Sequence, residues 1–369
     1  MSAQNTSSQF QLNNAHANSS VDFISKLPTE IVLHNILPRI VGRQPVRLYL
    51  DDDSSYFNVC SAWSERFALL VDDNVMHWIG HNTSLTDGDM TRIAAAAPFL
   101  QSLFIHTSRD SLFRLGHSIR FSSLANVLIY LITSQDSIHR LLKAMPELKH
   151  MEIKLYDPQQ RRVRTWELLD QCPKLIHVKL THGHSMPIAT IPDRHPVYPN
   201  VLYLEIFTRT RLRRDLITPF IKHFPNLTAL RLPHPHSQQV HNAINQYFPK
   251  LRQLFIGPPT RTSQMNATAI PDHDDGQGLR LFHLTTSGMD NVLFQQLMMQ
   301  HHETLVTIVL ETSLRAVTNI GNHNVEFHKL SSIECPPRMP EQSMLCIQWL
   351  VRHAPMLETV NGNPVSHQR

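Results

Sequence analysis

The sequence predicts an α/β fold in which a small N-terminal helical segment is followed by a curved solenoid, with parallel strands on its concave face and helices on its convex face. Three observations lead to this fold. A short apolar phrase recurs at nearly constant spacing, an amphipathic segment lies between successive copies, and a proline closes several of these segments. One strand with one helix cannot bury its own apolar side, so such units must stack.

The phrase has apolar residues at its first, fourth and sixth positions, as in Leu227, Leu230 and Leu232. Successive copies are about 26 residues apart on average, inside the range of roughly 20–29 residues that is typical of leucine-rich repeats. We therefore predict an irregular leucine-rich-repeat solenoid over residues 85–363, with a short tail at 364–369. The first apolar residues of the copies are Leu100, Leu124, Leu148, Leu175, Val201, Leu227, Leu251, Leu279, Leu305, Leu330 and Leu357.

The segments between the phrases predict helices, because their apolar residues stand three and four positions apart. Ile217, Phe220, Ile221 and Phe224 form one such face. Phe224 precedes a proline, which disfavours the helical conformation at the residue before it, so the helix ends there and the strand follows. The predicted helices cover 137–145, 165–171, 215–224, 238–248, 290–302 and 343–353.

The turns after the strands depart from the most regular leucine-rich pattern, in which an asparagine or cysteine follows each strand. Here the chain continues with Tyr156-Asp157, Thr181-His182 or Pro233-His234. We therefore expect the turns to use other backbone partners and the solenoid to curve irregularly. Two stretches, 183–195 and 257–278, predict insertions.

Composition sets limits on the function. The net charge of +4 is spread along the chain and gives no strong case for nucleic acid. No apolar run reaches the roughly 18 residues of a membrane span and no signal pattern opens the chain, so we expect a cytoplasmic or nuclear protein without a membrane partner. Residues 1–21, rich in Ser, Asn and Gln, predict a disordered leader.

We find no pattern that predicts chemistry. The four cysteines, Cys60, Cys172, Cys335 and Cys346, form no CxxC pair, and Cys172 and Cys335 occupy core positions of the phrase. The closest histidine pairs have no carboxylate or thiol at metal-ligand spacing. The sequence therefore predicts no catalytic residue, no metal site and no cofactor, and the chain is not expected to be an enzyme.

Residues 22–80 carry a second pattern. Leu27-Pro28-x-Glu30 opens an apolar helix that includes Ile36-Leu37, and Val59-Cys60-x-x-Trp63 follows later. This order resembles the F-box family, although the apolar pair stands one residue late and the connection before Val59 is long. The resemblance implies docking on a Skp-type adaptor of a cullin–RING ubiquitin ligase. By resemblance, the adaptor-facing residues are Leu27, Pro28, Ile31, Val32, Ile36, Leu37, Val59 and Trp63.

The same resemblance implies that the repeats recruit a protein substrate for the ligase. Two alternatives stay open: residues 22–80 could simply cap the solenoid, and the chain could be a leucine-rich scaffold that binds proteins without a ligase. Strand residues between the core positions should face the concave side, where Phe207 and Phe255 are expected to be exposed anchors unless loops over the rim cover them. The expected substrate-facing residues are Glu152, Lys154, Lys179, Glu205, Phe207, Arg231, Phe255 and His283, with Thr181, Val309 and Glu311 beside them.

Overall fold

The fold is taken from a computed structural model of the chain. It describes residues 47–49, 77–80, 87–97, 100–106, 109–131, 135–155, 165–182, 197–208, 214–234, 238–258, 278–285, 289, 291–312, 325–336 and 341–365. All of them belong to one compact unit, formed by residues 45–55 and 74–369. The predicted leader and the eight predicted adaptor-facing residues lie outside the described residues, and so do 183–195 and most of 257–278.

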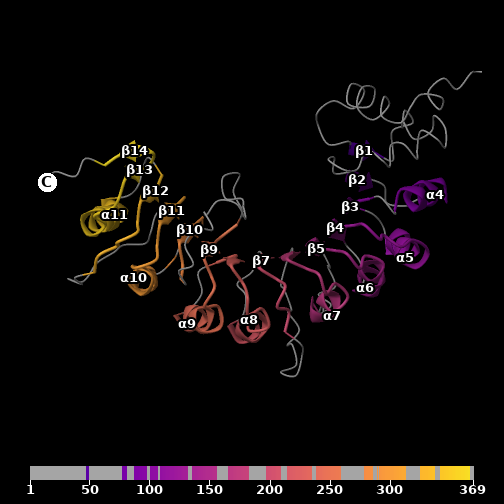
Figure 1. The fold of residues 1–369 in the computed structure, drawn as a ribbon, viewed down its shortest axis with the longest axis horizontal. Coiled ribbons are helices and arrows are strands. Elements are labelled where there is room, and N and C mark those ends of the chain that lie inside the picture. Colours follow the sequence, from indigo (N-terminus) through magenta and orange to yellow (C-terminus); the bar gives the residue numbers. More distant parts are fainter. Residues whose placement is uncertain are drawn as a thin grey trace, which may run out of the picture. The chain divides into compact units, whose positions relative to one another are not determined.

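The strands form a single 14-stranded sheet in which each strand lies next to its neighbours in the sequence (Figure 1). All pairs from β1 to β13 are parallel, and only the last pair, β13 with β14, is antiparallel. This is the sheet of a repeat solenoid, because each new unit adds one strand at the same edge. The strands are β1 (Arg47–Tyr49), β2 (His77–Gly80), β3 (Ser102–His106), β4 (Asn126–Leu131), β5 (His150–Leu155), β6 (His177–His182), β7 (Tyr203–Thr208), β8 (Ala229–Leu232), β9 (Gln253–Ile256), β10 (Leu281–Leu284), β11 (Thr307–Leu310), β12 (Ser332–Glu334), β13 (Thr359–Val360) and β14 (Asn363–Pro364).

Helices lie along one side of this sheet and link successive strands (Figure 1). The six helices that the amphipathic pattern predicts are all present, with ends shifted by a few residues. Among the described residues, two helices that the sequence did not predict, α4 and α5, precede them. The helices are α4 (Asp87–Ala96), α5 (Arg109–Ser118), α6 (Gln135–Lys143), α7 (Thr165–Leu169), α8 (Arg214–Ile221), α9 (Gln238–Tyr247), α10 (Asn291–Gln300) and α11 (Glu341–His353).

The core lies between the helices and the sheet and is built by the repeated phrase. The first apolar residue is buried in all eleven copies, from Leu100 to Leu357. The second and third are buried as well until the end of the sheet, where Cys335 and Val360 are half-buried. The expectation that Cys335 belongs to the core is therefore wrong, because β13 and β14 close the sheet as a hairpin and add no further unit over it.

The turns that enter the strands are held by backbone hydrogen bonds. The prediction concerned the turns after the strands, many of which lie outside the described residues. One carbonyl at the start of each unit accepts two backbone N–H groups from the next: Thr228 and Ala229 donate to Leu202, and Arg252 and Gln253 donate to Thr228. The same pair of backbone hydrogen bonds to one carbonyl recurs at every step from β4 to β13. A backbone ladder of this kind needs no particular side chain.

The sheet begins inside the range that resembles an F-box. Residues 47–49 form β1 and residues 77–80 form β2, and β2 pairs with β3 in parallel register. Trp78 is therefore a strand residue, which pairs with Leu103. A deletion of the first 80 residues would accordingly remove two strands of the solenoid.

Gly116 marks the closest approach between α5 and α6. A Cβ at this position would lie 2.6 Å from the backbone nitrogen of Leu141 and 2.8 Å from the carbonyl carbon of Arg140. Gly116→Ala would gain about 1 kcal/mol of helix propensity, but forcing two helix backbones apart costs more, typically about 1–3 kcal/mol. We expect a net loss of about 1 kcal/mol in urea unfolding, with Ser118→Ala of the same helix as a near-neutral control. A more stable Gly116→Ala variant would contradict this packing.

Candidate functional site

The predicted substrate-facing residues all lie on the helix-free face, which is the face of the sheet away from α4–α11. Six of them form one row across neighbouring strands, because the register aligns each with the next. Lys154 and Phe207 stand in the adjacent row, two residues further along their strands, with Thr181 between them. The aligned row runs through Glu152, Lys179, Glu205, Arg231, Phe255 and His283.

The expected exposure of the two aromatic residues is wrong. Phe207 is 8% exposed and Phe255 is 2% exposed. Part of the reason lies in their neighbours within the rows. The Lys179 ammonium lies 5.8 Å from the centre of the Phe207 ring, and the Arg231 guanidinium lies 4.3 Å from the centre of the Phe255 ring. These rings stabilise cations of the same chain, so they cannot act as free anchors for another protein.

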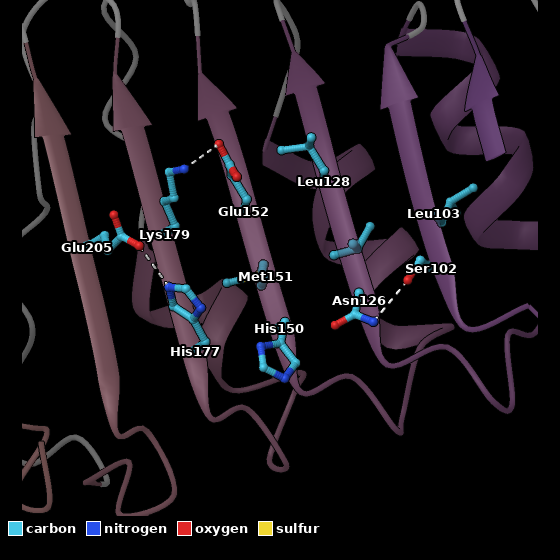
Figure 2. A pocket seen from close by; sticks show the side chains of 11 residues that line it. Ser102, Leu103, Asn126, Leu128, His150, Met151, Glu152, His177, Lys179 and Glu205 are labelled. Atoms are coloured by element: carbon cyan, nitrogen blue, oxygen red, sulfur yellow. Dashed lines mark hydrogen bonds and ion pairs between the residues drawn. The ribbon is translucent and has the colours of Figure 1, made fainter. Parts of the chain in front are cut away.

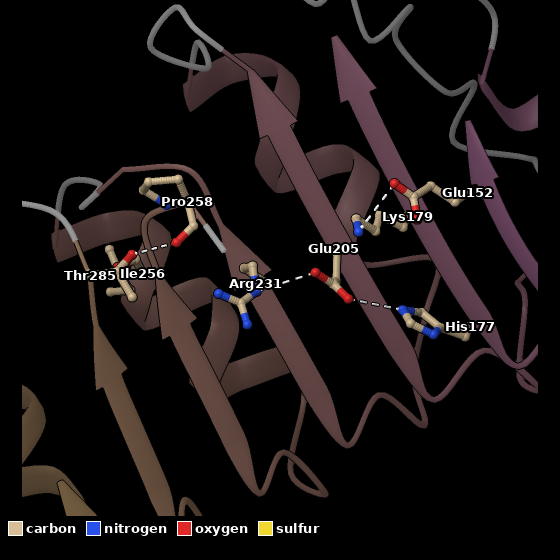
Figure 3. A network of polar contacts seen from close by, with 8 residues as sticks. All are labelled: Glu152, His177, Lys179, Glu205, Arg231, Ile256, Pro258 and Thr285. Atoms are coloured by element: carbon tan, nitrogen blue, oxygen red, sulfur yellow. Dashed lines mark hydrogen bonds and ion pairs between the residues drawn. The ribbon is translucent and has the colours of Figure 1, made fainter. Parts of the chain in front are cut away.

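Glu205 lies at the centre of a buried chain of charges (Figure 3). One carboxylate oxygen lies 3.1 Å from Nε2 of His177, and the other lies 3.3 Å from Nε of Arg231, which is fully buried. Burial raises the pKa of Glu205, but the hydrogen bond from His177 and the charges of Arg231 and Lys179 outweigh it and hold the pKa below its ordinary value. Glu205 is therefore ionised at neutral pH, with the Arg231 guanidinium on one side and a hydrogen bond from His177 on the other.

The same row continues with a second histidine–carboxylate pair. Nε2 of His283 lies 2.9 Å from a carboxylate oxygen of Glu311, and its ring lies 5.5 Å from that of Phe255. Burial lowers the pKa of His283, although the hydrogen bond to Glu311 opposes the change. The middle of the helix-free face, from β7 to β10, is thus filled with contacts among its own side chains.

A hollow of about 460 Å³ opens on the same face between β3 and β7 (Figure 2). Leu128 is half-buried and faces the hollow, whereas Leu103, Val127 and Met151 border it only as strand positions, because their side chains are buried in the core. Around them stand polar groups that are half-buried or exposed. These are Asn126, His150, Glu152, His177 and Lys179, together with the buried Ser102 and Glu205.

The lining of the hollow includes Glu152, Glu205 and Lys179, and Lys154 lies just beyond it. A single oxygen of Glu152 lies 3.1 Å from the ammonium of Lys154 and 3.2 Å from that of Lys179. All three side chains are between 21% and 24% exposed. Two ammonium groups therefore share one carboxylate oxygen at this end of the site.

Rings line the opposite side of the hollow. His150 and His177 meet edge to face with their centres 5.9 Å apart, and Tyr203 follows 5.8 Å from His177. Burial, His177 and Lys149 together lower the pKa of His150, so this ring is neutral at pH 7. Next to it, the amide of Asn126 donates to the hydroxyl of Ser102 over 2.9 Å.

The sequence reasoning missed this polar side of the hollow. Ser102, Asn126, His150 and His177 each stand directly before the second apolar residue of a phrase, and so does Tyr203 beside the hollow. Residues two positions apart in a strand share a face, so a residue two positions before a predicted concave-face residue also lies on the helix-free face. That signal was present, but only the residues further along each strand were considered.

The described part of the chain holds no group of three or more His, Cys, Asp or Glu side chains that could bind a metal ion. Cys172 and Cys346 are buried free thiols, and burial raises the pKa of each to about 12. Among the described helices, none is both long and apolar enough to cross a membrane.

Comparisons with known proteins add little. No family model matches the sequence, and no curated protein matches it. Among solved structures, a structural-genomics protein from Bacteroides fragilis aligns with 78% of this chain and 75% of its own, at 12% sequence identity and a TM-score of 0.35. A TM-score this low supports no conclusion about function. What the structure itself shows is a repeat-built α/β scaffold of the kind that serves protein interaction.

Proposed function

We propose that this protein is the substrate-recognition subunit of a Skp–cullin–F-box ubiquitin ligase, in which residues 22–80 dock the adaptor and the solenoid binds a protein substrate. The observation that supports the recognition part is the hollow on the helix-free face, which is lined mainly by polar strand residues. Repeat solenoids present extended surfaces of this type to other proteins.

The adaptor part of the proposal rests on the F-box resemblance alone. An apolar pair of helices too small to bury its own surface makes a suitable protein interface. Because 47–49 and 77–80 are strands of the sheet, the docking residues would come from the stretches before and between them. The second candidate, a leucine-rich scaffold without a ligase, has the same solenoid and lacks only this docking step.

A pull-down with purified Skp-type adaptor distinguishes the two. Leu27→Ala combined with Pro28→Ala should reduce recovery of the adaptor by about tenfold or more, which corresponds to a loss of about 1.4 kcal/mol. Pro355→Ala combined with Met356→Ala is the matched control, because it also removes an adjacent proline and apolar residue, both exposed, from the far end of the chain. Equal adaptor recovery by both double variants, or none by the wild type, would rule out the ligase role.

A further inference from the structure

We propose that a second surface of the solenoid binds an acidic protein segment in an extended conformation. This surface, which we call the entry rim, consists of the chain segments that lead into β4–β9. The proposal goes beyond the recognition role of the helix-free face and depends on neither the hollow nor the adaptor. The segments of the entry rim are 118–125, 143–149, 169–176, 197–202, 221–228 and 247–252.

The entry rim is one side of the molecule because the strands are parallel. β4–β9 pair each with the next, so all six strands begin at the same side of the sheet. Backbone hydrogen bonds join successive segments directly: Lys149 donates to Ala125, and Arg252 donates to Thr228, each over 2.8 Å. Figure 2 shows the turns that enter β4–β7 side by side below their strands. Side chains of successive units therefore stand next to one another along the rim.

Positive charge is concentrated on the entry rim. With histidine neutral, its described residues include seven cationic side chains and two carboxylates, an excess of five positive charges. Both carboxylates already have partners on the rim. Glu147 accepts from Lys174 at 2.6 and 2.7 Å, and Asp170 accepts from the Tyr198 hydroxyl at 2.8 Å. The cations are the exposed Arg120, Lys143, Lys149, Lys174 and Lys250 and the half-buried Lys222 and Arg252.

The segments that lead into β10–β13 do not share this excess. Among their described residues, Arg280 and Lys329 stand against Glu303, Glu326 and Glu358. Arg280 is in addition buried. The positive charge therefore belongs to one part of the solenoid rather than to its turns in general. The segments compared are 278–280, 300–306, 325–331 and 353–358.

The helix ends explain only part of the excess. The last turn of a helix attracts cations, because its carbonyl groups carry partial negative charge, and this attraction falls off beyond that turn. It accounts for Lys143, which ends α6. Lys149, Lys174 and Lys250 stand in turns beyond the helices. A further source of negative charge, from outside this chain, would balance these three lysines.

An acidic polypeptide fits the rim better than a single-stranded nucleic acid does. Bases need exposed aromatic faces on which to stack. In an extended polypeptide, side chains on one face recur about every 6.6 Å, so successive carboxylates can meet cations of different units. Lys250 is placed for such a contact, since it donates over 3.0 Å to the neutral amide oxygen of Asn226. The described aromatic residues of the rim are all buried or half-buried: Phe121, Tyr198, Phe224, Tyr247 and Phe248.

The test is fluorescence anisotropy with a labelled peptide of six alternating Glu-Ser pairs, titrated with the purified full chain. The peptide should bind, and its affinity should fall about tenfold between about 50 and about 300 mM salt, because exposed charges are screened. Lys149→Glu combined with Lys250→Glu should weaken binding by about tenfold or more. Arg120→Glu combined with Lys143→Glu should do the same through other units of the rim, and circular dichroism identifies the variants that fold.

Lys329→Glu combined with Arg352→Glu is the matched control. It makes the same change of charge at two exposed residues of the C-terminal units and should alter the affinity by less than about twofold. Absence of peptide binding, binding that does not depend on salt, or equal losses in the rim and control variants would overturn the proposal. So would tighter binding of an oligothymidylate with six phosphates, because the rim would then take a different class of polyanion.

This proposal and the ligase role can fail separately. The variants of the entry rim should recover the adaptor as well as the wild type does, because none of the changed residues belongs to the range that resembles an F-box. Loss of adaptor recovery leaves the peptide measurements unaffected, and loss of peptide binding leaves the adaptor result unaffected.

Discussion

Arg231→Met is expected to lower the free energy of unfolding by about 3–5 kcal/mol, the cost of breaking a buried ion pair on one side. Arg231 is fully buried and Glu205 is 6% exposed, so the variant leaves a buried carboxylate without its guanidinium. His177 remains within 3.1 Å of Glu205 and compensates only in part. Urea unfolding of the full chain, followed by circular dichroism, measures the loss.

The double variant Glu205→Leu with Arg231→Met is the control for this prediction. Replacing both charges by apolar groups of similar size removes the uncompensated carboxylate, so its stability should return to within about 2 kcal/mol of the wild type. A double variant whose loss equals the sum of the two single losses would show that the two side chains do not act as a pair.

The pH dependence gives the pair a second signature. The pKa of Glu205 lies below its ordinary value of 4.5 in the folded chain, so ionised Glu205 contributes stability above that pH. This contribution is lost as the pH falls through the folded pKa, where the carboxylate becomes protonated. In the Arg231→Met variant the guanidinium no longer lowers the pKa of Glu205, so burial raises this pKa above its value in the wild type. The stability difference between wild type and Arg231→Met should therefore shrink as the pH falls below 4.5.

Phe224→Ala should also be strongly destabilising, by about 3–5 kcal/mol, because truncating a buried phenylalanine leaves a cavity in a close-packed core. The Phe224 ring is fully buried and lies 5.1 Å from that of Phe220 and 5.6 Å from that of Tyr198, measured between ring centres. It thus joins α8 to the segment that leads into β7, and its loss weakens two successive units.

Phe224→Leu serves as the control in the same urea experiment, since it keeps most of the buried volume. We expect it to cost less than half as much as the alanine variant. Similar losses for both variants would mean that the aromatic contacts, rather than the filled volume, hold the two units together.

The periodic part of this fold could be read from the sequence because it depends on local rules. The phrase places an apolar residue at Leu227, Leu230 and Leu232, and the same spacing recurs until Leu357, so one rule predicts each strand and each core position. The proline after Phe224 predicts the end of a helix in the same local way: α8 ends at Ile221 and a turn leads to the proline. By contrast, β1 and β2 carry no copy of the phrase, and their place in the sheet follows only from the pairing of β1 with β2 and of β2 with β3.

The candidate site was predictable in its position but not in its properties. Strand alternation places Glu205, Arg231 and Phe255 on the helix-free face, as the structure has them. Alternation does not say which of these side chains contact one another, because the contacts join residues about 26 positions apart through the register of the sheet. The sequence therefore predicted Phe255 as exposed, whereas the structure places Arg231 over its ring.

The sequence by itself thus determined the repeat, the buried positions and the direction in which each strand side chain points. These depend on the spacing of apolar residues within a single unit. Only the tertiary structure decided which outward-facing residues are neutralised by their neighbours and which border the hollow. That division depends on the lateral alignment of separate units, where one carboxylate, Glu205, is enclosed by His177 and Arg231 and another, Glu152, is shared by two lysines at an open surface.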